Sequence, residues 1–217
     1  MTIRVALLGD SIAAGAGASR AADALGPRLV TGLAARGVDA TTQVYAVSGA
    51  RSSALRGQVD RALTWAPHLA VVVIGANDLT HRTPPAQAAS ALEDAVRRLR
   101  SAGVEVVVAP APDLSAVPQV PSGLRAVLQA ASTQLRDHQI AGTTAADGHV
   151  ADGDGTTSRA FAADPALFSA DRFHPSSRGY AVIAEALLPV VYAATTRLRQ
   201  PAADAIPESA PTQRSTS

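Results

Sequence analysis

The chain has 217 residues, of which 47% are hydrophobic, so it is long and apolar enough to bury the core of one globular domain. Its 19 basic and 18 acidic residues give a formal net charge of +1 at pH 7, which offers no electrostatic basis for binding nucleic acid. The sequence contains no cysteine and no lysine, which excludes disulfides, thiolate nucleophiles, P-loop lysines and serine–lysine dyads.

Strand-like and helix-like segments alternate along the chain. Predicted strands cover residues 3–8, 40–47, 69–74, 104–109 and 142–145. Predicted helices cover about residues 21–36, 54–63, 85–101, 122–136 and 177–198. This alternation predicts an α/β fold in which helices cover both faces of a parallel sheet. We expect residues 1–199 to form a single domain, and residues 200–217, rich in Pro, Ala, Ser and Thr, to form a disordered tail.

Two apolar segments bear on the location of the protein. Residues 5–8 are too short for a signal sequence and lack a preceding basic region, so we expect a cytoplasmic protein. The stretch from Tyr180 to Tyr192 is interrupted by Glu185 and Pro189, and we interpret it as a core helix with no membrane span.

A serine follows the first predicted strand. Residues 5–8 are all apolar, as in a central strand of a parallel sheet, and Gly9, Asp10 and Ser11 come directly after them. Ligands of parallel sheets bind outside the carboxyl ends of the strands, so Ser11 stands where a nucleophile can be presented. Serine and aspartate are also ordinary turn and helix-capping residues, and we interpret Asp10 as structural.

Three further strings at strand ends or before the last helix carry residue types that acyl transfer uses. They are Val47-Ser48-Gly49-Ala50, Val73-Ile74-Gly75-Ala76-Asn77-Asp78 and Asp171-Arg172-Phe173-His174-Pro175. Each string has a structural alternative, because glycine, asparagine and aspartate also serve turns and helix caps. Their coincidence in one chain favours a catalytic interpretation.

An imidazole near neutral pH is suited to take the proton of a serine hydroxyl. His174 is therefore the candidate base. Asp171, three residues earlier, is spaced to hold the ring in the tautomer that the reaction needs. The nucleophile elbow of the α/β-hydrolases is absent, since Ala13 stands where that motif requires glycine.

The four strings, in this order, resemble the sequence blocks of the SGNH hydrolases, also called GDSL lipases and esterases. The resemblance spans residues 9–175, and its visible departure is Ile12 where the family usually has leucine. It implies a three-layer α/β/α sandwich of flavodoxin-like topology with a mostly parallel five-stranded sheet.

The same resemblance implies the roles of individual residues. Ser11, His174 and Asp171 correspond to the catalytic triad. The backbone N–H groups of Ser11 and Gly49 and the side-chain amide of Asn77 correspond to the oxyanion hole.

The expected activity is hydrolysis of a small-molecule carboxylic ester or thioester through an acyl-enzyme intermediate. Low aromatic content favours small to medium acyl groups over sugars, and residues 110–121 are a candidate wall for the acyl pocket. An acyltransferase with the same triad and a catalytically silent binding module remain alternatives. The oligomeric state stays open.

Two other strings suggest ligands but lack the full pattern. Asp152-Gly153-Asp154-Gly155 resembles the start of a calcium loop, but Ala163 stands where the bidentate glutamate is needed. Gly15-Ala16-Gly17 does not complete a dinucleotide motif, because Arg20 replaces its last glycine. We therefore predict neither a metal nor a cofactor.

Overall fold

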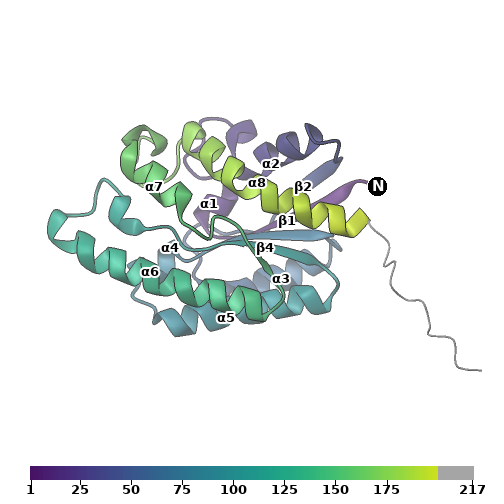
Figure 1. The fold of residues 1–217 in the computed structure, drawn as a ribbon, viewed down its shortest axis with the longest axis horizontal. Helices are drawn as coiled ribbons and strands as arrows, with labels where there is room; N and C mark the ends of the chain where they lie inside the picture. The colour runs from purple at the N-terminus through teal and green to yellow at the C-terminus, as the bar shows by residue number, and fades with distance from the viewer. Residues whose placement is uncertain (200–217) are drawn as a thin grey trace, which may run out of the picture.

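A computed structural model describes residues 1–199. Its centre is a five-stranded sheet in the order β2-β1-β3-β4-β5, and every neighbouring pair is parallel (Figure 1). The strands are β1 (Ile3–Gly9), β2 (Ala40–Val44), β3 (Leu69–Val73), β4 (Glu105–Ala109) and β5 (His149–Val150). This is the flavodoxin-like strand order, so the predicted fold class is confirmed.

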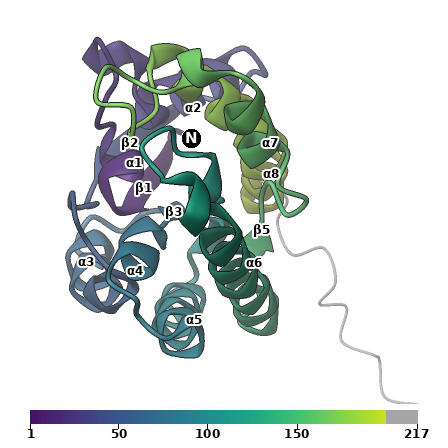
Figure 2. The ribbon, with the colours of Figure 1, turned by 90° about the vertical axis from the view of Figure 1, so that its left-hand side faces the viewer.

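Helices cover both faces of the sheet. They are α1 (Ser11–Ala14), α2 (Leu25–Ala34), α3 (Leu55–Leu63), α4 (Ala76–Thr80), α5 (Pro85–Ser101), α6 (Ser122–Ala145), α7 (Thr156–Ala163) and α8 (Ser177–Arg199). Figure 2 faces the carboxyl ends of the strands and shows α2, α7 and α8 on one side of the sheet and α3 and α5 on the other. The protein is therefore a three-layer sandwich.

The alternation of side chains along the strands divides the core into two layers. Val5 and Leu7 of β1 pack in the cluster that includes α2 and α8. Ala6 and Leu8 of the same strand pack in the cluster that includes α3 and α5. Because β1 and β3 are buried on both faces, they read in the sequence as continuous apolar runs.

The predicted strand at residues 142–145 is wrong, because these residues form the end of α6 and the fifth strand lies at His149–Val150. Tertiary contacts keep this part of the chain helical. Gln139 of α6 accepts a hydrogen bond from the N–H of Ala111 and donates one to the carbonyl of Ile74. The neighbouring Thr143 is fully buried, so α6 continues past the predicted end at residue 136.

The short helices α1, α4 and α7 escaped prediction, since segments of four to eight residues show too little periodicity. Helix α8 is long and apolar enough to pass a length and composition test for a membrane span, a test that core helices also pass. Its residues Tyr180, Leu187 and Val191 are buried in the cluster shared with α2. These contacts are those of a core helix. The predicted tail, residues 200–217, lies outside the described residues.

The turn after β1 requires glycine, and this requirement can be tested. A Cβ on Gly9, whose φ is +128°, would lie 1.8 Å from the carbonyl oxygen of Val73. Gly37 has a φ of +74° but has no atom within 4 Å of the same position. We expect Gly37→Ala to cost about 1 kcal/mol of unfolding free energy and Gly9→Ala to cost about 3 kcal/mol or more, measured by urea denaturation. Equal losses in the two variants would show that the contact with β3 imposes no constraint.

Candidate active site

Ser11 is the first residue of α1, directly after the turn that ends β1. The Asp10 side chain accepts a hydrogen bond from the N–H of Ile12 at 3.0 Å and so caps this short helix. The Gln58 side chain holds the turn from α3, because it accepts from the N–H of Gly9 at 2.7 Å and donates to its carbonyl at 2.8 Å. Ser11 is thus presented by a backbone that is bonded on both sides of it.

Ser11, His174 and Asp171 form a continuous chain of hydrogen-bonding contacts. The Oγ of Ser11 lies 3.1 Å from Nε2 of His174, and Nδ1 of the same ring lies 2.6 Å from Oδ2 of Asp171. Ser11 is 163 positions from His174 in the sequence, so the fold alone brings them together. With Nδ1 bonded to the carboxylate, Nε2 faces the hydroxyl as an acceptor.

The Asp171 carboxylate is held by more groups than the sequence predicted. Its Oδ1 accepts from Ser169 Oγ at 2.7 Å and from the backbone N–H groups of Phe173 and His174, both at 2.9 Å. Burial opposes ionisation, but the bonds from His174, Ser169 and the two N–H groups together hold the pKa of Asp171 well below its usual range. Asp171 therefore stays an anion across the neutral and mildly acidic range.

Ser169 carried no sequence signal of its own, because an isolated serine before an Asp-x-x-His string is not distinctive. The structure pairs it with the loop that carries Asp171 and His174. Its N–H donates to the carbonyl of His174 at 2.8 Å, and Phe168 and Pro175 form an antiparallel bridge around it. These contacts close the loop and fix the ring and the carboxylate relative to each other.

Gly49 and Asn77 follow the ends of β2 and β3, which flank β1 on its two sides. The Asn77 amide donates a hydrogen bond to the carbonyl of Ala50 at 3.1 Å, which connects the two loops. Gly49 has a φ of +81°, and no atom lies within 4 Å of the position of a Cβ. The glycine is required by its backbone conformation, and the space before it is open.

A second link joins the same loops below the surface. Asp78 is buried, and its Oδ2 accepts from the backbone N–H of Ser52 at 2.9 Å and from its hydroxyl at 2.8 Å. The N–H of Val47 donates to the carbonyl of Gly9 at 3.1 Å. The loops after β1, β2 and β3 are therefore bonded into one assembly, from which Ser11 and Asn77 both project.

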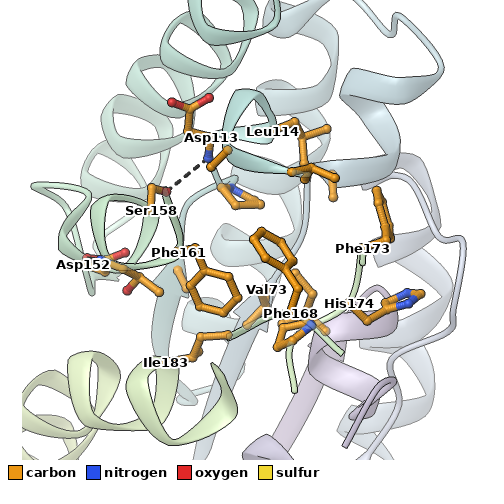
Figure 3. Close-up of a pocket in the computed structure, with 18 of the residues that line it drawn as sticks. Val73, Asp113, Leu114, Asp152, Ser158, Phe161, Phe168, Phe173, His174 and Ile183 are labelled. Carbon is orange, nitrogen blue, oxygen red and sulfur yellow. Dashed lines mark hydrogen bonds between the residues drawn. The ribbon is translucent and has the colours of Figure 1, made fainter. Parts of the chain in front are cut away.

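An apolar cavity of about 80 Å³ opens beside Ser11 and His174. Its walls come from the end of β3, the segment at residues 109–117, α7, the loop at residues 168–175 and α8 (Figure 3). The rings of Phe161 and Phe168 meet edge to face there, with centroids 5.0 Å apart. Leu114 and Val117 lie in the segment that the sequence nominated as a pocket wall, and both line the cavity.

The fold and site together define a flavodoxin-like α/β protein with a Ser-His-Asp array at the carboxyl edge of its sheet. Residues 7–182 match the sequence model of the GDSL-like lipase/acylhydrolase family, and the chain belongs to this family. It is 37% identical over 189 residues to a GDSL-like esterase of Mycobacterium tuberculosis. That match covers 85% of this chain and 60% of the relative, so the chain spans well under two thirds of the relative's length.

Several solved structures share the fold at low sequence identity. The psychrotrophic esterase EstA of Pseudoalteromonas superposes with a TM-score of 0.70 at 17% identity, covering 91% of this chain and 99% of that one. TesA gives a TM-score of 0.70 at 20% identity, with 88% and 99% covered. The acetylxylan esterase Axe2 of Geobacillus stearothermophilus gives 0.68 at 17% identity, with 87% and 94% covered.

Asp10 carries a charge where burial disfavours one. Its side chain is 1% exposed, as is that of Asp78, and burial raises the pKa of Asp10 to about 6. The N–H of Ile12 opposes this rise, and the negative charge of Asp78 adds to it. Oδ2 of Asp10 and Oδ1 of Asp78 have no hydrogen-bond partner among the described residues.

The Asp10 carboxylate should therefore destabilise the fold above pH 6. An acid whose pKa is about 6 when folded and 3.8 when unfolded supports stability at low pH and loses that contribution as the pH rises through this interval. We expect Asp10→Asn, which keeps the acceptor for Ile12, to raise the unfolding free energy by about 2–3 kcal/mol at pH 7.5 and by much less at pH 4. Denaturation at both pH values measures the difference. An equal effect at the two pH values would contradict it.

Proposed function

We propose that this protein is a serine esterase that hydrolyses carboxylic esters of small to medium acyl groups through an acyl-enzyme intermediate. The observation that carries the proposal is the bonded chain from Asp171 through His174 to Ser11, which ends at the mouth of an apolar cavity. Family membership and the esterase relative support the same activity.

In the first step, Nε2 of His174 takes the hydroxyl proton of Ser11 while Oγ attacks the ester carbonyl. Negative charge develops on the carbonyl oxygen. The N–H groups of Ser11 and Gly49 and the Asn77 amide are the proposed donors to this oxyanion. His174 then gives its proton to the departing alcohol, and the acyl group stays on Ser11.

In the second step, His174 takes a proton from water, and the resulting nucleophile attacks the acyl-enzyme. The tetrahedral intermediate collapses, the carboxylic acid leaves and Ser11 recovers its proton from His174. The ionised Asp171 stabilises the imidazolium in both steps. These two reaction steps need no metal ion. Among residues 1–199, no group of three His, Asp or Glu side chains is placed to hold one.

The cavity supports the choice of acyl group. One water molecule occupies about 10–15 Å³ of such a cavity, so a cavity of about 80 Å³ holds several water-sized groups. That suits a chain of a few carbons better than a long fatty acid. The wall of Phe161, Phe168 and Ile183 offers an acyl chain apolar contact.

The first test removes members of the triad. We expect Ser11→Ala and His174→Ala each to lower kcat for p-nitrophenyl butanoate roughly 10⁴- to 10⁶-fold, and the double variant to be little worse, because the two groups act in one step. Asp171→Asn should cost somewhat less. Stopped-flow or steady-state assays across acetyl to decanoyl esters measure kcat and the acyl-length optimum together.

Circular dichroism and thermal unfolding serve as controls for folding in each variant. Independent, multiplicative losses in the double variant would contradict a shared catalytic step. Formation of a butanoyl ester when an alcohol is added, in preference to acid, would identify an acyltransferase instead.

A second prediction concerns the Asn77 amide. Asn77→Ala should lower kcat about 10²- to 10³-fold with little change in KM, since the amide acts on charge that appears in the transition state. Asn77 also bonds Ala50, so a variant that weakens the same connection between loops is the matched control. Ser52→Ala removes one hydrogen bond to Asp78 and no proposed oxyanion donor. Equal loss of kcat in the two variants would reduce Asn77 to a structural role.

A further inference from the structure

We propose that the leaving-group side of this site is cationic and selects esters whose alcohol part carries an anionic group, such as a sulfonate, phosphate or carboxylate. The residues that provide the charge are Arg51, Arg82 and Arg172. The inference rests on the proposed esterase function and adds the chemical class of the leaving group.

The two sides of Ser11 differ in character. The cavity on one side is apolar and bounded by α7, α8 and residues 109–117, which suits the acyl group. The departing alcohol must then lie outside this cavity and beside His174, which gives it a proton. None of Arg51, Arg82 and Arg172 lines the apolar cavity.

Each of the three arginines belongs to a loop that is bonded into the site. Arg51 follows Ala50, whose carbonyl accepts from the Asn77 amide at 3.1 Å. Arg82 follows the end of α4, the five-residue helix that carries Asn77, and its N–H donates to the carbonyl of Leu79 at 3.1 Å. Arg172 lies between Asp171 and His174, and its N–H donates to the Ser169 carbonyl at 2.9 Å.

All three side chains are exposed. Within residues 1–199, Arg51, Arg82 and Arg172 make no side-chain hydrogen bond or ion pair. Apart from Arg56 and Arg199, every other arginine of this region does. Those that do are Arg4, Arg20, Arg28, Arg36, Arg61, Arg97, Arg98, Arg100, Arg125, Arg136, Arg159, Arg178 and Arg197.

The carboxylates on the same loops are already engaged or buried. Asp171 is bonded to His174 and Ser169, and Asp78 is buried against Ser52. Asp10 is buried beneath Ser11 and has a raised pKa. The exposed charged groups on these loops are therefore the three guanidinium cations and the half-exposed carboxylate of Asp171, so cations outnumber anions at this surface.

Backbone conformation gives a separate reason to assign a role to two of these side chains. Arg82 has a φ of +54° and Arg172 a φ of +58°, in the left-handed region that favours glycine and asparagine. An arginine there costs about 1 kcal/mol relative to glycine. The cost accompanies two unpaired cations at the site, which is consistent with a requirement for the charge.

The test compares two butanoyl esters of similar size and leaving-group acidity. One is the ester of 4-hydroxybenzenesulfonate, which is anionic, and the other is the ester of 4-hydroxybenzenesulfonamide, which is neutral. At low salt we expect kcat/KM for the anionic ester to exceed that for the neutral ester about 5- to 20-fold, as two or three exposed ionic contacts would give. The ratio should approach one in 1 M NaCl, where the Debye length is about 3 Å.

The variants Arg51→Gln, Arg82→Gln and Arg172→Gln should each lower this ratio about 2- to 4-fold, and the triple variant should bring it close to one. Arg36→Gln is the matched control, because Arg36 is an exposed arginine after α2, beside the amino end of β2 at the opposite edge of the sheet. It should leave the ratio unchanged.

The outcomes separate this inference from the proposed function. Hydrolysis of both esters at equal kcat/KM, abolished by Ser11→Ala and insensitive to salt, would overturn the cationic leaving-group site and leave the esterase intact. A preference for the anionic ester that persists in the triple variant would overturn the assignment to these arginines. Hydrolysis that survives Ser11→Ala would instead overturn the proposed function.

Discussion

The close approach of the β1 turn to β3 is the constraint on which the site depends. Gly9 lies so near the Val73 carbonyl that no side chain fits between them, and the N–H of Asp10 donates to that carbonyl at 3.1 Å. The turn is held from the other side by Gln58. The position of Ser11 at the start of α1 is therefore fixed relative to the carboxyl edge of the sheet. The loops after β2 and β3 are bonded to each other beside it.

This arrangement buries two carboxyl groups, those of Asp10 and Asp78. Asp78 joins the loop after β2 to α4 through Ser52, and Asp10 caps α1 beside Ser11. Burial raises the pKa of Asp10, so its carboxylate reduces the stability of the fold at neutral pH. The two carboxyl groups fix the backbone beside Ser11 and Asn77, so the local cost accompanies a rigid site.

The segments around Ser11 differ in their chemistry. Apolar walls from α7, α8 and residues 109–117 lie beside Ser11, and Arg51, Arg82 and Arg172, on loops that follow β2, β3 and α7, do not line them. The loop segments are places where side chains can vary without disturbing the sheet. Among residues 1–199, the hydrogen-bonded triad and its supporting loops form the part of the site that such variation would leave in place.

The amino-acid sequence predicted four of the five strands and the residues that we propose for the site. Continuous apolar runs mark β1 and β3 because both faces of these strands are buried, and the carboxyl ends of parallel strands meet at one edge. Ser11 and Asn77 follow these runs and Gly49 follows the predicted strand at residues 40–47, so their common location could be expected from the chain alone. Asp171 and His174 were identified by their spacing and by the family resemblance.

Features that depend on contacts between distant segments could be established only from the folded chain. Residues 142–145 have a β-branched pair typical of a strand, but Gln139 and the buried Thr143 keep them in α6. Ser169 gained its place beside Asp171 through a loop closed by the bridge between Phe168 and Pro175. Local patterns record the periodicity of burial, whereas the partner of a polar group depends on which segments the folded chain brings together.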